Sequence, residues 1–478
     1  MKIDHIAEPE IEFGLGQRHI DIRFGIANYG PLDVESEGAP KVIRLGVVGT
    51  PEDVERAVLW FDRCRTPIPG AASRQPNLRP PFPGFNSESA FRSQLVLGHS
   101  LQRTIPSRVF EELSKSGDAN ALVSGSVDVF MSHFADLLEH ERVDVLLAAV
   151  PERLATQMDP RQRLAIPVGA VRLNFHDLLK ASAMRLASAK PVQLMLPSTS
   201  DPTMARRAKS GKQVRRLQDE ATRAWNLHTA LYYKAQGRPW RIPRDNKEVM
   251  TCFVGISFYY DLERDNVLTS MAQVFDERGD GVIVRGGSVE LSKRDRTPHL
   301  SAADAEGLLG EALARYRATH ETFPARVVVH KTSAFDGPEL EGIRASIGKE
   351  RVSRLDAISI ADDETPKLFR YGAYPPLRGT WLELDEKSHL LYTHGSVDFY
   401  ATYPGLYVPQ PIVFRCDERQ ATPRQIAREM LALSKLNWNH TQFDASQPIT
   451  LVAARKVGAI LKYLGPSDHV APRYSFYM

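Results

Sequence analysis

A short block in the middle of the chain stands out by its charge. The sequence RRAKSGKQVRR at 206–216 has six basic residues in eleven positions and no acid. Such a block is usually a solvated face or a mobile tail. This one lies between a buried-strand pattern at 191–197 and a helix pattern at 219–236. A strand, a basic loop and a helix in that order are typical of a ligand-binding, doubly wound α/β domain, so both interpretations stay open on charge alone.

Composition narrows the class of protein. The chain has 478 residues, 42% hydrophobic and 25% charged, with a formal net charge of +3. These values are ordinary for a globular protein and exclude a disordered, collagen-like or coiled-coil chain. Three distant cysteines, Cys64, Cys252 and Cys416, offer no disulfide framework and no CxxC metal pair. We find no secretion signal and no apolar run long enough to cross a membrane, so we expect a cytoplasmic protein without a membrane partner.

The elements that position the basic block form an α/β pattern. VIRLGVVG at 42–49 and VDVLLAAVP at 143–151 are apolar runs typical of buried parallel strands. PEDVERAVLWFDRC, after the first run, reads as an amphipathic helix with proline in its first turn. We therefore predict a Rossmann-like domain at 136–245, preceded at 1–135 by a Pro- and Gly-rich segment that wraps its neighbours.

The pattern changes after Pro243. TCFVGISFYY at 251–260 and the run from Leu268 read as adjacent antiparallel strands, followed by a capped helix at 301–320 and a buried strand, RVVVHK, at 326–331. Antiparallel strands followed by a helix and a parallel strand are the plan of an RNase H-like domain. We predict this second α/β domain at 246–478.

Several strings in these two domains resemble one family. They are LQDEATRAWNLHTALYYKAQGRPW at 217–240, VGISFYY at 254–260, VVVHKTSAFDGPELEGI at 327–343, LSKLNWNHTQFDASQPITLVAARKVGAILKYLG at 433–465 and the final RYSFYM. In this order they resemble the short prokaryotic Argonautes, which consist of a MID and a PIWI domain. The resemblance covers roughly the C-terminal half and is weaker before it. It implies a MID domain at 136–245 and a PIWI domain at 246–478.

The resemblance implies a site for the 5′ phosphate of a guide strand in the MID domain. Gln213 and Lys234 stand where the family has a glutamine and a helix lysine, and Lys209 and Lys212 are the nearest other basic ligands. The family's second helix lysine is replaced by Ala230. In the family, the C-terminal carboxylate can also reach this pocket, where Mg²⁺ bridges it to the phosphate. We therefore expect Met478 to be a metal ligand through its carboxylate.

The resemblance also implies that the PIWI domain does not cut. An RNase H-like nuclease holds two metal ions with carboxylates. Ser257 and Thr332 occupy the positions of two of them, and we find no ligand for a third near the last helix. Asp261 and Asp265 are well away from Ser257 along an extended strand. We therefore expect no enzyme activity from this chain.

By resemblance, the chain senses DNA together with a partner. Such Argonautes bind a guide RNA and a complementary single-stranded DNA target, and they pair with an APAZ-containing effector, often sirtuin-like or TIR, that consumes NAD in defence against invading DNA. Weaker candidates for contacts along the nucleic-acid channel are Arg285, Lys331, Lys435, Asn437 and Asn439. We interpret His330 as a hydrogen-bonded core histidine rather than a ligand.

Two other functions remain open. An RNase H-like nuclease with displaced carboxylates predicts Mg²⁺-dependent cutting that is lost when Asp261 or Asp265 is replaced. A plain single-strand binding protein predicts equal affinity for phosphorylated and hydroxyl-ended strands.

Overall fold

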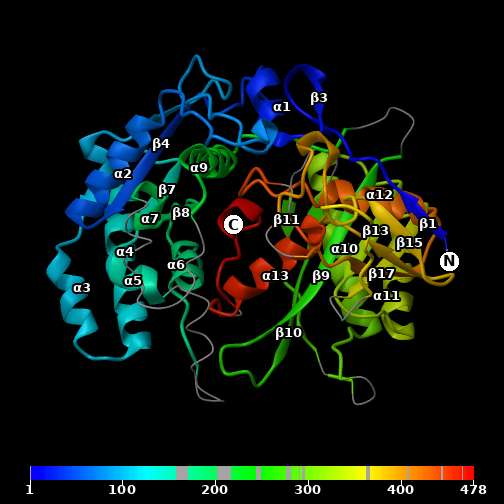
Figure 1. Cartoon of the computed structure of the whole chain (residues 1–478). Coiled ribbons are helices and arrows are strands. Elements are labelled where there is room, and N and C mark those ends of the chain that lie inside the picture. Colours follow the sequence, from blue (N-terminus) through cyan, green and yellow to red (C-terminus); the bar gives the residue numbers. More distant parts are fainter. Residues whose placement is uncertain are drawn as a thin grey trace.

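The computed structural model contains two sheet-based lobes that meet at the C-terminal tail (Figure 1). It describes the whole chain except residues 1, 158–170, 202–216, 244–248, 276–280, 290, 293–295, 362–365, 406–407, 443–444 and 466.

The first lobe is built on a parallel sheet whose strand order is β5-β4-β7-β8, with β6 also paired to β4. The runs predicted as buried strands form β4 and β7, and β7 is buried along its whole length. Its elements are β4 (Val42–Gly49), α2 (Pro51–Arg63), β5 (Gln94–Val96), β6 (Gln102–Thr104), α3 (Ser107–Ser114), α4 (Ala119–His140), β7 (Val145–Ala149), α5 (Glu152–Gln157), α6 (Phe175–Ala183), β8 (Val192–Met195), α7 (Pro197–Ser200) and α9 (Glu220–Lys234).

Helix α2 shows why these elements begin where they do. Thr50 caps its N-terminus by accepting a hydrogen bond from the backbone N–H of Asp53, and Pro51 occupies the first turn. Because β4 pairs with β7, this sheet crosses the boundary predicted at residue 135. The first 135 residues thus supply strands to the lobe and do more than wrap it.

The second lobe is built on a ten-stranded mixed sheet. Its order is β1-β15-β16-β17-β14-β13-β9-β10-β11, with β12 beside β10, and the antiparallel pairing of β9 with β10 was predicted. Its elements are β1 (Lys2–His5), β9 (Thr251–Tyr260), β10 (Val267–Phe275), β11 (Gly281–Ile283), β12 (Ser288–Val289), α10 (Ala302–His320), β13 (Arg326–Lys331), α11 (Gly337–Lys349), β14 (Arg354–Ala361), β15 (Thr380–Glu383), β16 (Ser388–Leu391), β17 (Ile412–Glu418), α12 (Pro423–Leu433) and α13 (Ile449–Leu461).

Short elements link the lobes. Strand β1 joins the edge of the second sheet, and the backbone of Glu12 pairs with Arg241. Near the C-terminus a one-turn helix, η6, is largely buried and lies beside α9 and β11 (Figure 1). The remaining elements are β2 (Ile11–Glu12), η1 (Gly14–Gly16), β3 (Arg18–His19), α1 (Ile22–Tyr29), η2 (Pro76–Leu78), η3 (His99–Leu101), η5 (Asp398–Tyr400) and η6 (Tyr474–Phe476).

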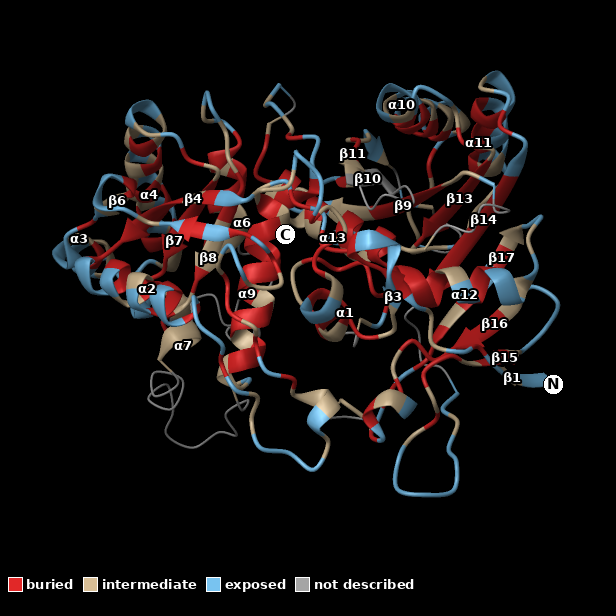
Figure 2. Ribbon diagram, turned by 90° about the horizontal axis from the view of Figure 1, so that it is seen from above, coloured by how far each residue is buried: buried red, intermediate tan, exposed pale blue. Residues whose placement is uncertain are grey.

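One described helix, α4, has the length and hydropathy that a membrane span would need. Leu122, Val127, Phe130 and Phe134 on this helix are buried in the core of the first lobe (Figure 2). Packing of this kind is that of a core helix.

Candidate functional site

Lys234 lies in the last turn of α9 and is almost completely buried, at 1% exposure. Asp219 caps the start of this helix by accepting from the backbone N–H of Thr222 at 3.0 Å. Most of α9 is buried because the helix runs between other elements of the core (Figure 2). The Nζ atom of Lys234 has no hydrogen-bond partner among the residues that the structure describes. An ammonium group without a partner in the interior is costly, which is typical of a ligand site.

Two more lysines approach Lys234 from other helices. Lys180 lies on α6, is 2% exposed and donates a hydrogen bond to the main-chain oxygen of Met478. Lys456 lies on α13, which packs against α6. Helices from both lobes and the C-terminal tail therefore bring these groups together. We call Lys180, Lys234 and Lys456 the lysine cluster.

The pKa values in the cluster show how closely its charges interact. Burial, and then the charge of Lys456, lower the pKa of Lys234 to about 7. Burial lowers the pKa of Lys180 as well, followed by the charges of Lys234 and Lys456. Asp177 is the carboxylate that opposes these shifts at Lys180 and Lys456. Asp177 is thus the one acidic side chain among the described residues that opposes the shifts of these lysines, and three cations beside one such side chain favour binding of an anion.

His176 adds no positive charge to the cluster at neutral pH. Burial, followed by the charge of Lys180, lowers its pKa to about 4, although a hydrogen bond between its Nδ1 and Asp177 at 2.8 Å opposes these effects. The imidazole is therefore neutral near pH 7 and is able to exchange hydrogen bonds with an anion or with water.

The tail that reaches the cluster is firmly docked. Met478 is 3% exposed, and Tyr474 and Tyr477 are buried, as expected for the aromatic RYSFYM. The hydroxyl of Tyr477 donates to the carbonyl of Ala471 at 2.9 Å, and the N–H of Ile283 donates to that of Pro472 at 2.9 Å. The second lobe thus holds the tail against the lysine cluster.

The structure describes only one residue of the predicted phosphate site. Lys234 is in the cluster, whereas Lys209, Lys212 and Gln213 lie outside the described residues. Sequence reasoning missed Lys180 and Lys456. The available signal was a lysine within a helix rich in apolar residues, in FHDLLKASA and in ITLVAARKVGAIL.

Ser257 lies within β9, beside the end of β13, which Thr332 follows. Strands β9 and β13 are parallel with Ile256 opposite Lys331, so the next residues, Ser257 and Thr332, follow side by side at the carboxyl edge. Between these strands and α13, His330 is fully buried and its Nδ1 lies 2.9 Å from the hydroxyl of Thr450. The interpretation of His330 as a hydrogen-bonded core histidine is thus confirmed.

Asp261 and Asp265 belong to the turn between β9 and β10. Asp261 accepts hydrogen bonds from the backbone N–H groups of Asp265 at 2.9 Å and Asn266 at 3.1 Å. These bonds and that from the Asn266 side chain lower the pKa of the Asp261 carboxyl. The geometry therefore indicates that Asp261 stabilises this turn.

Lys331 was predicted to face a nucleic-acid channel, but the structure buries it completely. Its Nζ lies 2.5 and 2.6 Å from the two carboxylate oxygens of Glu339 on α11. Glu339 also accepts from the N–H of Leu300 at 2.7 Å, and His299 and Asp336 lie close to it. Because Lys331 already neutralises this acidic group, its ammonium is not accessible to a phosphate backbone.

The other channel candidates also make internal contacts. Lys435 is 1% exposed, lies 2.7 Å from Glu8 and donates to the carbonyls of Pro9 and Ile20, so it fastens the N-terminal segment to the second lobe. Beyond the end of α12, the backbone N–H of Asn439 donates to the side-chain oxygen of Asn437. Arg285 donates to the carbonyls of Leu464 and Gly465.

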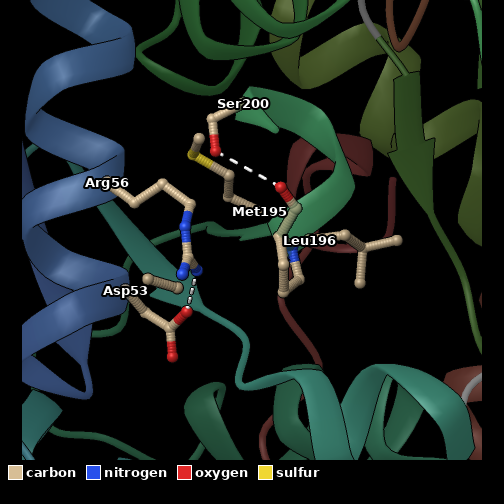
Figure 3. Close-up of a pocket in the computed structure, with 7 residues that line it drawn as sticks. Asp53, Arg56, Met195, Leu196 and Ser200 are labelled. Atoms are coloured by element: carbon tan, nitrogen blue, oxygen red, sulfur yellow. Dashed lines mark hydrogen bonds and ion pairs between the residues drawn. The ribbon is translucent and has the colours of Figure 1, made fainter. Parts of the chain in front are cut away.

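A small hollow lies at the carboxyl ends of β7 and β8, away from the lysine cluster. Figure 3 shows Asp53, Arg56, Met195, Leu196 and Ser200 in its lining. Arg56 is paired with Asp53 at 2.5 Å, and Ser200 donates to the carbonyl of Pro197 at 3.3 Å. Since its charged groups are already paired, the hollow offers less to an anion than the lysine cluster.

Solved structures of Argonautes are similar to the whole chain. Clostridium butyricum Argonaute bound to a guide DNA and a 19-mer target DNA has a TM-score of 0.65 at 13% identity, over 100% of this chain and 55% of that one. A. aeolicus Argonaute has a TM-score of 0.56 at 14% identity, over 98% of this chain and 54% of that one. Aa-Ago with externally bound siRNA has a TM-score of 0.59 at 13% identity, over 100% of this chain and 56% of that one.

This similarity shows the fold. It is a mixed α/β, Argonaute-like fold with a Rossmann-like MID lobe and an RNase H-like PIWI lobe, and the predicted fold class is confirmed. The chain spans little more than half the length of those Argonautes. No protein-family model and no curated protein matches it.

Proposed function

We propose that the chain binds the 5′ phosphate of a guide strand at the lysine cluster. The observation that carries the proposal is the ammonium of Lys234, which is buried beside two other lysines and has no hydrogen-bond partner in the described part of the chain. A phosphate dianion would supply the missing negative charge and accept charge-assisted hydrogen bonds. Similarity in fold to Argonautes solved with guide DNA or siRNA supports a nucleic acid as the ligand.

The guide is proposed to be RNA that pairs with a single-stranded DNA target without cutting it. Support for the absence of cutting comes from Ser257 and Thr332, which lie side by side at the edge where an RNase H-like nuclease needs carboxylates. A hydroxyl lacks the negative charge that a carboxylate brings to Mg²⁺. Cleavage of complementary DNA by the chain alone in Mg²⁺ would instead support the nuclease alternative.

The described residues do not fit the Mg²⁺ ion expected at Met478. The main-chain oxygen of Met478 already accepts from Lys180, and two more ammonium groups lie nearby. A divalent ion there would compete with Lys180 for the carboxylate and would be repelled by the cluster. We propose that the ammonium groups neutralise the phosphate themselves, so that binding persists when EDTA removes divalent ions.

The partner is proposed to be an APAZ-containing effector, sirtuin-like or TIR, that is activated by target binding and consumes NAD in defence in the cytoplasm. This part rests on the resemblance of the sequence strings to short Argonautes. Co-expression with the candidate effector and purification through one tag tests it. Failure of the two chains to co-elute in the presence of guide and target would contradict it.

The phosphate site is tested by fluorescence anisotropy with 5′-phosphorylated and 5′-hydroxyl RNA at one fixed salt concentration, because phosphate contacts are salt-dependent. We expect the parent chain to bind the phosphorylated end roughly 10- to 100-fold more tightly, because hydrogen bonds to charged groups contribute binding free energy of that size. Lys234→Met should lose this preference. Lys349→Met, which removes a lysine that is 71% exposed, should keep it. Equal binding of both ends by the parent would refute the site.

A further inference from the structure

The segment between β14 and β15 displays aromatic and basic side chains to solvent. Its described part, 366–374, reads PKLFRYGAY and contains two cations and no acid. Phe369 is 79% exposed, Tyr371 is fully exposed and Tyr374 is 39% exposed. Lys367 and Arg370 are also exposed. Large exposed aromatic groups gathered in so short a segment indicate an interaction surface.

Specific contacts hold this loop in place. Leu368 packs against the cluster of Leu382, Leu390 and Tyr392. Its backbone N–H donates to the hydroxyl of Tyr392 at 2.6 Å, and Nε of Arg370 donates to the carbonyl of Tyr374 at 3.1 Å. Gly372 has φ of +116°, which a residue with a side chain rarely adopts. Anchoring of Leu368 therefore fixes a conformation in which its neighbour Phe369 points away from the core.

The topology puts the loop at the functional edge of the PIWI sheet. Strand β14 is parallel to β13, so its end at Ala361 lies at the same edge as Thr332. Strands β17, β16 and β15 then alternate in direction, which returns the start of β15 at Thr380 to that edge (Figure 2). In open α/β sheets, ligands bind outside the carboxyl ends of the strands.

We infer that loop 366–374 binds a nucleic-acid strand by stacking bases on Phe369 and Tyr371, while Lys367 and Arg370 contact its phosphates. Exposed aromatic faces combined with cations are the chemistry of single-strand recognition. The inference rests on the proposed function for the identity of the strand, which is the guide. Asp362, Asp363 and Glu364, just before the loop, lie outside the described residues.

The test uses the full chain with the substitutions Phe369→Ala and Tyr371→Ala combined. The control variant is Leu59→Ala, which also removes a solvent-exposed apolar group, since Leu59 is 63% exposed on α2. Anisotropy is measured with 5′-phosphorylated and 5′-hydroxyl strands at fixed salt. We expect the double variant to bind both strands about 10-fold more weakly, with its ratio between the two ends unchanged. The Leu59 variant should bind like the parent.

The two proposals fail in different ways. If the parent shows no phosphate preference but the loop variant still weakens both strands, the lysine site fails and the loop inference stands. Unchanged affinity of the double variant for both strands would overturn the loop inference. If the double variant keeps its affinity for both strands but no longer co-elutes with the effector, the loop inference is also overturned, because the loop would then be a protein-binding surface. Lys367→Ala should reduce the slope of log affinity against log salt by about one. An unchanged slope would show that Lys367 does not contact a phosphate.

Discussion

Two regions of this molecule bury lysine side chains and provide them with opposite surroundings. In the PIWI lobe, Lys331 is fully buried and meets both carboxylate oxygens of Glu339. Between the lobes, Lys234 is equally buried, has no hydrogen-bond partner within the described ranges and faces the charge of Lys456. The first arrangement satisfies its charge internally, whereas the second needs a ligand to do so. Burial alone therefore does not identify a binding lysine, but burial without a counter-charge does.

The largest effect is expected from breaking the satisfied pair. Lys331→Met leaves the carboxylate of Glu339 buried without its ammonium partner, and removal of one member of a buried pair typically costs about 3–5 kcal/mol. The free energy of unfolding, measured by urea denaturation, should fall by this amount. The double variant Lys331→Met with Glu339→Gln should recover part of the loss, since the uncompensated charge is gone. A single variant as stable as the parent would mean that Glu339 is not held by Lys331.

A pH series tests the unsatisfied lysine in two ways. The unfolded chain keeps a lysine protonated up to its ordinary pKa near 10.5, whereas folded Lys234 loses its proton near 7. The unfolded state thus binds more protons between these values, so Lys234 makes the unliganded protein more stable as pH rises from about 7. Phosphate binding needs the ammonium form, and affinity should fall above pH 7 by up to tenfold per unit, or about 1.4 kcal/mol.

The measurement is anisotropy with the 5′-phosphorylated strand from pH 6.5 to 9 at fixed salt, above the second phosphate pKa of about 6. Lys234→Met should bind weakly with a shallower pH dependence. An affinity of the parent that stays flat across this range would show that Lys234 is not protonated on binding.

Replacing the same unsatisfied lysine should make the empty protein more stable. Lys234→Met keeps most of the side-chain volume and removes a buried charge that repels Lys180, so the free energy of unfolding near pH 7 should rise by about 1 kcal/mol. The sign is opposite to that of Lys331→Met. The comparison is made without nucleic acid, because a bound strand would stabilise the parent selectively. A loss of stability in this variant would place Lys234 in the same class as Lys331.

The sequence predicted much of the fold because local signals agreed with it. β4 and β7 are runs of apolar residues that a parallel sheet buries on both faces, and Asp219 marks the start of α9. The extent of the first lobe was harder to predict. Its sheet joins β4 to β7 across almost 100 residues, and pairing at that distance leaves no periodic mark in the chain.

Only part of the candidate site was predicted, because contacts between distant segments leave no local mark in the sequence. Lys234 was found through a family resemblance, but Lys180 and Lys456 come from helices far apart in the sequence, and only their packing brings them together. Lys331 was misjudged because its position at a strand end resembles that of a ligand-binding residue. Its partner Glu339 sits eight residues later in a capping box, and spacing alone does not show that the carboxylate turns back toward the strand.

The smallest effect is expected from a lysine that has a partner but is not buried. Lys349 forms an ion pair with Glu306 and is 71% exposed. Water already solvates both groups, and holding two long side chains together costs conformational entropy, so exposed pairs contribute little. Lys349→Met should leave the unfolding midpoint and the 5′-phosphate preference unchanged within experimental scatter. A clear loss of stability would show that pairing, rather than burial, separates Lys331 from Lys234, and the inference that an unpaired buried lysine marks the ligand site would lose its basis.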